Sequence, residues 1–262
     1  MPSWVVHLYI YGPITVKEFI RLNEPKGFRL EDPFYSDIEL RGGGLGVLAH
    51  ITARASTSQL AHKAALFFFG QMLDCLALHI DQPLYISLFE RQPIRPERHS
   101  VQRIVEQEEW RSAFREARLL ALAEPTFLRA LGWYRKGLYT EDPFDKFLGF
   151  WNSIEVVAGK YHPQNEEAKK GSKSQIWECF KPLWGECDRW PIITGDLDWI
   201  DNNHELRNNI AHGIASIDIK RVEEVLEKIS TIQQVAYGFL RDWRERQLNP
   251  QIPADMEQLF RY

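Results

Sequence analysis

Residues 142–160 read DPFDKFLGFWNSIEVVAGK, and this stretch decides the fold of the second half of the chain. Asp142 can cap a helix, and Pro143 suits the first helical position because no N–H donor is needed there. Apolar side chains then recur at steps of three and four residues, the spacing of a helix with one buried face. These side chains are Phe144, Phe147, Leu148, Trp151, Ile154 and Ala158. We therefore expect an amphipathic helix over residues 143–160.

The helical pattern continues on both sides of this segment. Further helices are expected over residues 104–123, 126–139 and 175–185, from Asp196 or Asp198 to His212, and over about 30 residues from Asp218. The polar residues 161–174 are expected to form a mobile loop. The other connections are short and favour antiparallel neighbours, so this region should be a bundle of roughly four or five helices.

The first part of the chain has a different pattern, in which short β-prone runs surround one helix. Strands are expected over residues 4–12, 36–41, 46–55 and 83–89, with Gly42–Gly44 as a hairpin turn. A helix capped by Ser56 or Thr57 should run to Ile80, and residues 91–100, which contain two prolines, should form a linker. The expected fold class is α+β, with a small α+β domain and its linker over residues 1–100 and a helical bundle over residues 101–262.

Composition excludes several classes of protein. The net charge of −4 on 262 residues argues against a module that binds long nucleic acids through charge alone. Three cysteines without CxxC spacing fit reduced thiols better than a disulfide framework or a zinc site. The apolar residues 64–80 include Gln71, Asp74 and His79, so they should form a buried helix and not a membrane span. With no secretory leader and no metal-binding or Walker-type motif, we expect a cytoplasmic protein without membrane association, metal or cofactor.

Residues 207–213, RNNIAHG, carry most of the functional information. The forked donors of Arg207 can hold a phosphate, and a neutral His212 can take a proton near neutral pH. Gly213 is expected to end the helix in a left-handed conformation. Metal-free RNA cleavage needs one group of each kind, so the segment predicts chemistry on phosphodiesters.

A helical bundle whose penultimate helix ends in Arg-Asn-x-x-x-His-Gly, followed by one long amphipathic helix, resembles the HEPN superfamily of nucleotide-binding domains. Arg207, Asn208 and His212 match the family motif, an Arg, often a polar residue, and a His. The segment from Trp133 to Glu155 is also similar to the opening helices of bacterial HEPN proteins of the MauJ and abortive-infection kinds. The resemblance covers roughly residues 125–246.

This resemblance implies a metal-independent endoribonuclease of the defence or toxin type, acting on single-stranded RNA or transfer RNA. In active relatives two protomers pair, and their Arg and His residues line one shared cleft. The His would help the ribose 2′-hydroxyl attack the phosphate, and the Arg would stabilise the charge that builds there. The products would be a 2′,3′-cyclic phosphate and a free 5′-hydroxyl.

Helix geometry bears on this mechanism. Arg207 and His212 are about 140° apart around an ideal helix and about 7.5 Å apart along its axis, so they do not share a face. Arg207 borders the apolar stripe of Trp199, Leu206 and Ile210. Asn208 lies four residues before His212 and could orient its imidazole by a hydrogen bond. A homodimer would therefore make a better enzyme than a monomer.

Other interpretations stay open. Arg207 could pair with Glu155 and hold the bundle together without chemistry, and His204 could be a second phosphate or base contact or merely solvated. The module could bind RNA, a nucleotide, an antitoxin or an effector without cleavage. The MauJ-like segment also suggests an accessory protein of methylamine metabolism.

Overall fold

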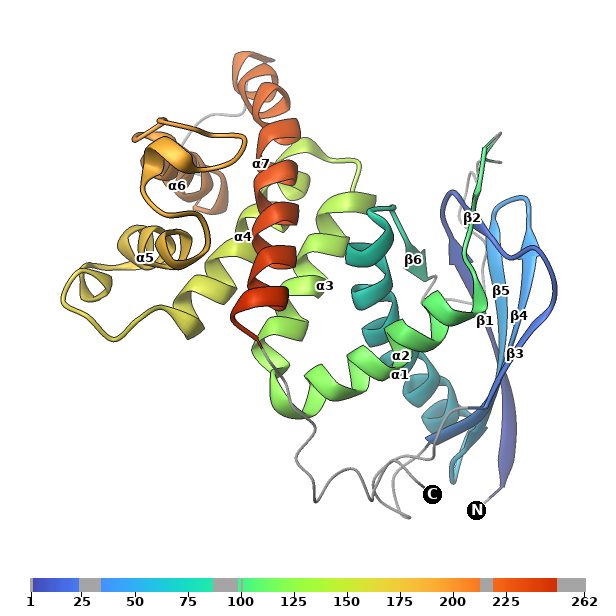
Figure 1. Ribbon diagram of the computed structural model, residues 1–262. Coiled ribbons are helices and arrows are strands. Elements are labelled where there is room, and N and C mark those ends of the chain that lie inside the picture. Colours follow the sequence, from blue (N-terminus) through green and yellow to red (C-terminus); the bar gives the residue numbers. More distant parts are fainter. Residues whose placement is uncertain (1, 24–33, 87–98, 100, 213–218, 249–262) are drawn as a thin grey trace. The chain divides into compact units, whose positions relative to one another are not determined.

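The computed structural model describes residues 2–23, 34–86, 99, 101–212 and 219–248 (Figure 1). The chain divides into two compact units that meet in sequence at Ala123 and Glu124. The first unit contains a β-sheet with helices, and the second is helical in its described residues. The α+β class expected from the sequence is confirmed.

The first unit is built on a five-stranded antiparallel sheet with strand order β3-β4-β5-β1-β6. The strands are β1 (Ser3–Tyr11), β3 (Ile20–Asn23), β4 (Phe34–Gly43), β5 (Gly46–Arg54) and β6 (Tyr85–Ile86). Strands β4 and β5 form the expected hairpin, with Gly43 paired to Gly46. A separate parallel pair joins β2 (Ile14–Thr15) to β7 (Arg103–Ile104). The sequence did not predict β2, β3 or β7.

Helix α1 (Ser58–Ile80) covers one face of this sheet. Thr57 caps the helix as expected, because its hydroxyl accepts a hydrogen bond from the Leu60 N–H at 3.2 Å. The helix is long and apolar enough to cross a membrane by length and composition, and half of the apolar window is buried inside the protein. Its contacts with β1, β4 and β5 account for that apolar content as a core helix.

Helix α2 (Gln107–Ala123) belongs to the first unit, although the sequence placed the boundary near residue 100 and assigned this helix to the bundle. The reason lies in the aromatic contacts between α1 and α2. The Phe69 ring lies 5.5 Å from that of Phe114, edge to face, and 6.4 Å from that of Trp110. These three side chains are fully buried, so α2 completes the core of the sheet unit.

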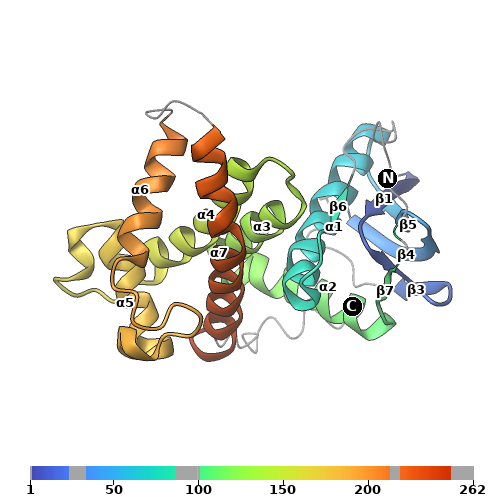
Figure 2. The ribbon, with the colours of Figure 1, turned by 90° about the horizontal axis from the view of Figure 1, so that it is seen from above.

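The second unit is a helical bundle in which α4 lies at the centre (Figure 2). Its helices are α3 (Pro125–Tyr139), α4 (Pro143–Tyr161), α5 (Ser172–Trp184), α6 (Trp199–Ala211) and α7 (Ile219–Arg246). Helix α4 packs against each of the other four. Its start is as expected, with the Asp142 carboxylate accepting from the Asp145 N–H at 2.9 Å and Pro143 in the first turn.

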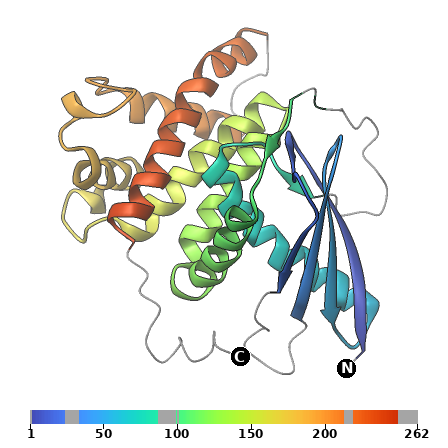
Figure 3. The same cartoon turned by 45° about the vertical axis from the view of Figure 1, so that its right-hand side comes forward.

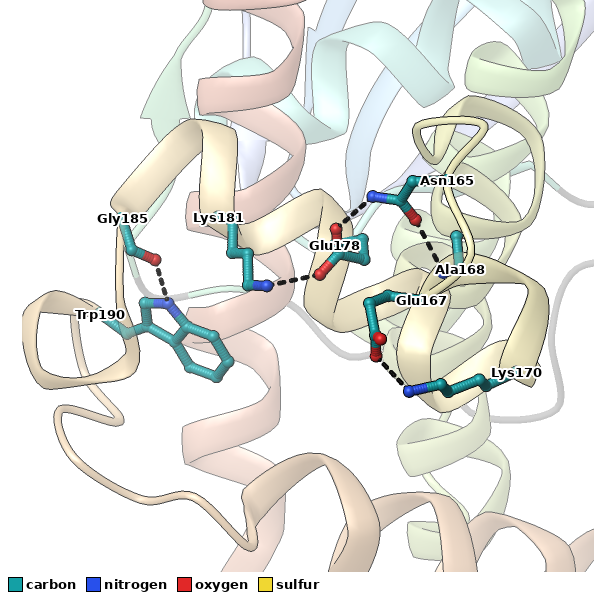
Figure 4. Close-up of polar contacts among 8 residues, drawn as sticks. All are labelled: Asn165, Glu167, Ala168, Lys170, Glu178, Lys181, Gly185 and Trp190. Carbon is teal, nitrogen blue, oxygen red and sulfur yellow. Dashed lines mark hydrogen bonds and ion pairs between the residues drawn. The ribbon is translucent and has the colours of Figure 1, made fainter.

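The connection from α4 to α5, expected as a mobile loop, is held by specific hydrogen bonds (Figure 4). The Asn165 side chain donates to the Glu178 carboxylate at 2.7 Å and accepts from the Ala168 N–H at 2.8 Å. Lys181 donates to the other oxygen of Glu178 at 2.6 Å. A short 3-10 helix, η1 (Ala168–Lys170), forms within this segment. A second one, η2 (Cys187–Arg189), follows α5.

Candidate functional site

Helix α6 fixes the positions of the motif residues by burying one narrow face. Trp199, Ile200, Asn203 and Leu206 are the buried residues of this helix, and Asn203 donates to the Trp199 carbonyl at 2.7 Å. The expected stripe of Trp199 and Leu206 is confirmed, whereas Ile210 is only partly buried. Asp198 is the N-cap residue, but its side chain makes no cap hydrogen bond.

Arg207 lies beside the buried face and pairs with Glu155 of α4. Its Nη2 is 3.2 Å from the Glu155 Oε2, and the two side chains are 28% and 19% exposed. Its Nη1 donates to the Asn208 Oδ1 at 3.1 Å. The Nε of Arg207 is buried and has no hydrogen-bond partner among the described residues. The ion pair that the sequence allowed is therefore present, and it joins α6 to α4.

A chain of hydrogen bonds extends from Arg207 to α5. The Asn208 Nδ2 is 3.2 Å from the His204 Nδ1, and the His204 Nε2 is 2.9 Å from the Ser172 Oγ. Arginine can only donate, so the amide oxygen of Asn208 faces Arg207 and its nitrogen faces His204. His204 must then accept at Nδ1 and carry its proton on Nε2. The Nε2–H of His204 then donates to the Ser172 Oγ, so His204 does not act as a base that activates Ser172 as a nucleophile.

The surroundings of His204 agree with a neutral ring. Burial lowers the pKa of His204 below its ordinary value, and the charges of Lys173 and Arg207 lower it further against the opposing effect of Glu155 and Asp201. The indole of Trp151 and the imidazole of His204 form a T-shaped pair, with ring centroids 6.3 Å apart. His204 is thus a packed member of the bundle and not simply a solvated side chain.

His212 is not a member of the chain of hydrogen bonds that links Arg207, Asn208, His204 and Ser172. It is exposed and forms the C-cap of α6, with helical φ and ψ of −98° and −1°. Its N–H donates to the Asn208 carbonyl at 3.0 Å, so the helical turn is retained and the angular separation from Arg207 persists. Gly213, the expected stop, lies outside the described residues.

The side chain of Asn208 does not form the hydrogen bond with the His212 imidazole that the sequence suggested. Two histidines lie four residues from it, and its amide contacts His204 instead of His212 in the described structure. The sequence did not identify Ser172 as a member of this cluster. It lies 32 positions from His204, and no local spacing signals such a contact.

The described residues contain no group of three or more His, Cys, Asp or Glu side chains that could hold a metal ion. The site offers one fixed guanidinium, one neutral half-buried imidazole and one exposed imidazole. These groups can bind a phosphate and move a proton, provided that Arg207 and His212 reach the same substrate.

Comparison with known proteins adds one finding. Residues 130–236, less than half of the chain, match the family of the methylamine utilization protein MauJ. MauJ-like proteins are of the HEPN type, so the resemblance drawn from the sequence is confirmed for this part of the chain. No curated protein and no solved structure matches.

Proposed function

We propose that the helical unit is a metal-independent endoribonuclease whose active site is completed by a second copy of the chain. The observation that carries this proposal is the contrast between Arg207 and His212. Arg207 is held in one orientation by Glu155 and Asn208, whereas His212 is exposed and on another side of α6. One copy therefore supplies both groups without bringing them together, as expected for a site shared by two chains.

The chemistry follows from the nature of the two groups. His212 would accept the proton of a ribose 2′-hydroxyl as that oxygen bonds to the adjacent phosphorus. The bond from phosphorus to the 5′-oxygen would break, and that oxygen would take up a proton. Arg207 would stabilise the negative charge on the phosphate oxygens, because its remaining N–H groups can still donate. The products would be a 2′,3′-cyclic phosphate and a 5′-hydroxyl end.

An apolar stripe on α7 supports the pairing of two copies. Ile219 and Leu226 are two turns apart on one side of the helix and are 79% and 54% exposed. Val222 and Ile229, which are partly buried, border the same side. A second copy would remove these side chains from water, at about 25 cal/mol for each Å² of apolar surface. Since α7 begins shortly after His212, this surface would bring two copies of the motif near each other.

A second candidate function, a non-catalytic HEPN-type binding module, is favoured by the Arg207–Glu155 pair. A carboxylate 3.2 Å from the guanidinium offsets the positive charge that a phosphate would need. In this case the pair would hold α6 on α4, and the module would bind RNA, a nucleotide or a protein without cleaving.

Cleavage of single-stranded RNA in the presence of EDTA separates the two functions. For the ribonuclease, Arg207→Ala and His212→Ala should each lower the cleavage rate by about 100-fold or more. His162→Ala is the matched control, because His162 is also a C-cap histidine, at the end of α4, and is partly exposed. Wild-type protein that leaves RNA intact, or an active His212→Ala variant, would reject the ribonuclease in favour of the binding module.

A separate experiment tests whether two copies of the chain must pair to form the site. Leu226→Glu should yield a monomer by light scattering and abolish cleavage, because a buried carboxylate opposes burial of the stripe. Leu197→Glu, which alters another leucine that is 64% exposed, should preserve both properties. A monomeric wild-type protein that cleaves RNA would contradict the shared site while leaving the ribonuclease intact.

A further inference from the structure

The sheet of the first unit has one face that no helix covers among the residues described for this unit (Figure 3). Side chains alternate between the two faces of a strand. In β1, Val6, Leu8 and Ile10 are buried on the side of α1. His7 and Tyr9 alternate with them and point to the opposite face. This second face is polar and aromatic, unlike the aliphatic face under α1.

Cross-strand pairing orders the side chains on this open face. Arg21, Glu39, His50 and His7 stand opposite one another in consecutive strands and form a row across β3, β4, β5 and β1. The rings of His7 and His50 are 4.4 Å apart. Along the direction of β1, a second group is formed by tyrosines: Tyr9 is 4.7 Å from Tyr11, and Tyr11 stacks on Tyr85 at 5.0 Å.

A hollow of about 370 Å³ lies at the end of the β4 strand. Phe19 contributes a ring that is 52% exposed, and the Arg41 guanidinium lies 5.3 Å above it. Lys17 adds a second cation to the wall. Gly42 lets the segment after β2 lie against the strand, since a Cβ at this position would be 2.8 Å from the Val16 carbonyl oxygen. The hollow is thus formed by the fold and combines an exposed ring with two cations and the carboxylate of Glu18.

The positive charge beside this hollow is only loosely paired. Arg21 and Arg41 both approach Glu39, each at 3.8 Å, and they are 62% and 57% exposed. One carboxylate cannot neutralise two guanidinium groups, and exposed pairs of this kind contribute little to stability. Both arginines can therefore turn toward an anion with little loss of folding free energy.

We propose that this open face binds single-stranded RNA, with one nucleotide in the hollow. An unpaired base can stack on the Phe19 ring and the Arg41 guanidinium, and the flanking phosphates would contact Lys17 and Arg41. The partly exposed Tyr9, held by its contact with Tyr11, extends the stacking surface along β1. Duplex RNA fits this surface poorly, because its base faces are hidden in the helix. The inference concerns binding alone and does not require that the helical unit cleaves RNA.

The test is fluorescence anisotropy with a fluorescein-labelled 12-residue oligouridylate and the full chain. The measurements use the His212→Ala background with EDTA, so that cleavage cannot alter the probe. Phe19→Ala should weaken binding about tenfold and leave the dependence on salt concentration unchanged, because stacking carries no charge. Arg41→Ala should weaken binding and also reduce the slope of log K against log salt by about 0.7.

Two matched variants serve as controls. Phe67→Ala removes a phenyl ring on α1 that is 59% exposed, and Arg115→Ala removes an arginine on α2 that is 68% exposed. Both should bind the probe as the parent protein does. The proposal fails if the parent protein does not bind the probe or binds duplex RNA equally well, or if the controls weaken binding as much as Phe19→Ala and Arg41→Ala do.

Discussion

His204 joins three helices through its ring. Its Nε2 contacts Ser172 at the start of α5, its Nδ1 contacts Asn208 on α6, and its ring makes a T-shaped contact with Trp151 of α4. This geometry requires the neutral ring, because a proton on Nδ1 would oppose the amide donor of Asn208. A protonated His204 would therefore lose one hydrogen bond and be half-buried as a cation, a cost of burial that the nearby carboxylates of Glu155 and Asp201 do not offset.

We predict that His204 makes folding depend on pH in mildly acidic solution. Its folded pKa lies below the ordinary value of 6.5, mainly because of burial, so the unfolded chain binds the proton more readily. The stabilisation is complete above pH 6.5 and decreases as the pH falls toward the folded pKa. Urea unfolding at pH 7.5 and 5.5 measures this loss, which should be smaller in His204→Gln. An equal loss in the variant, or a ring that titrates above 6.5 by NMR, would refute the role of His204.

The hydrogen-bond partner of Asn208 could not be predicted from the sequence. Asn208 has a histidine four positions away on each side, and both pairs have the same helical spacing. Arg207 orients the amide, and Ser172 of α5 holds the ring of His204. These are tertiary contacts, so local spacing could not decide between His204 and His212. The Arg207–Glu155 pair was foreseeable, because both residues border apolar stripes of helices in one bundle.

At the scale of elements, α3 and α4 approach each other at two glycines. A Cβ on Gly149 would lie 2.7 Å from the backbone of Gly137, and one on Gly137 would lie 2.8 Å from the Phe150 ring. Glycine inside a helix ordinarily costs about 1 kcal/mol relative to alanine. Its presence at both positions is explained by the close contact of the two helices, which allows Phe150 to be fully buried.

Two alanine substitutions within α4 should therefore act in opposite directions. Gly149→Ala should lower the free energy of unfolding by about 2 kcal/mol, because the methyl group would force the two helices apart. Gly159→Ala should raise it by about 0.5–1 kcal/mol, because nothing lies within 4 Å of a Cβ there and alanine favours the helix. Urea denaturation of the two variants measures both changes. A stabilising Gly149→Ala would show that α3 and α4 do not meet as closely as described.

Periodicity and caps predicted most elements well. The helix expected over residues 143–160 is α4, and the final helix expected from Asp218 is α7, which begins at Ile219. The missed strands are short: β2 and β7 have two residues each and β3 has four, too few for alternation to be visible. Helix α2 was predicted as a helix, but its pairing with α1 depends on Phe69 and Phe114, which lie far apart in sequence.

Across the two units, the three cysteines are distributed so that the reactivity of each thiol reflects the unit that contains it. Cys75 lies in α1 of the first unit, and Cys179 and Cys187 lie in the second. All three are free and buried, as expected for reduced core residues. Burial and the charge of Glu178 raise the pKa of Cys179 from 9.0 to about 12, and burial also raises that of Cys187.

Thiol labelling should therefore measure the unfolding of each unit. Native protein at pH 7.5 should react with Ellman's reagent very slowly, because the shift of the Cys179 pKa lowers its thiolate fraction roughly thousandfold and burial blocks access. Cys179 and Cys187 belong to one compact unit, so increasing urea should expose them together, with Cys75 following the first unit. Mass spectrometry of labelled peptides identifies each site. If Cys187 reacted at much lower urea than Cys179, the η2 segment would open before the bundle, and the second unit would not unfold as one cooperative body.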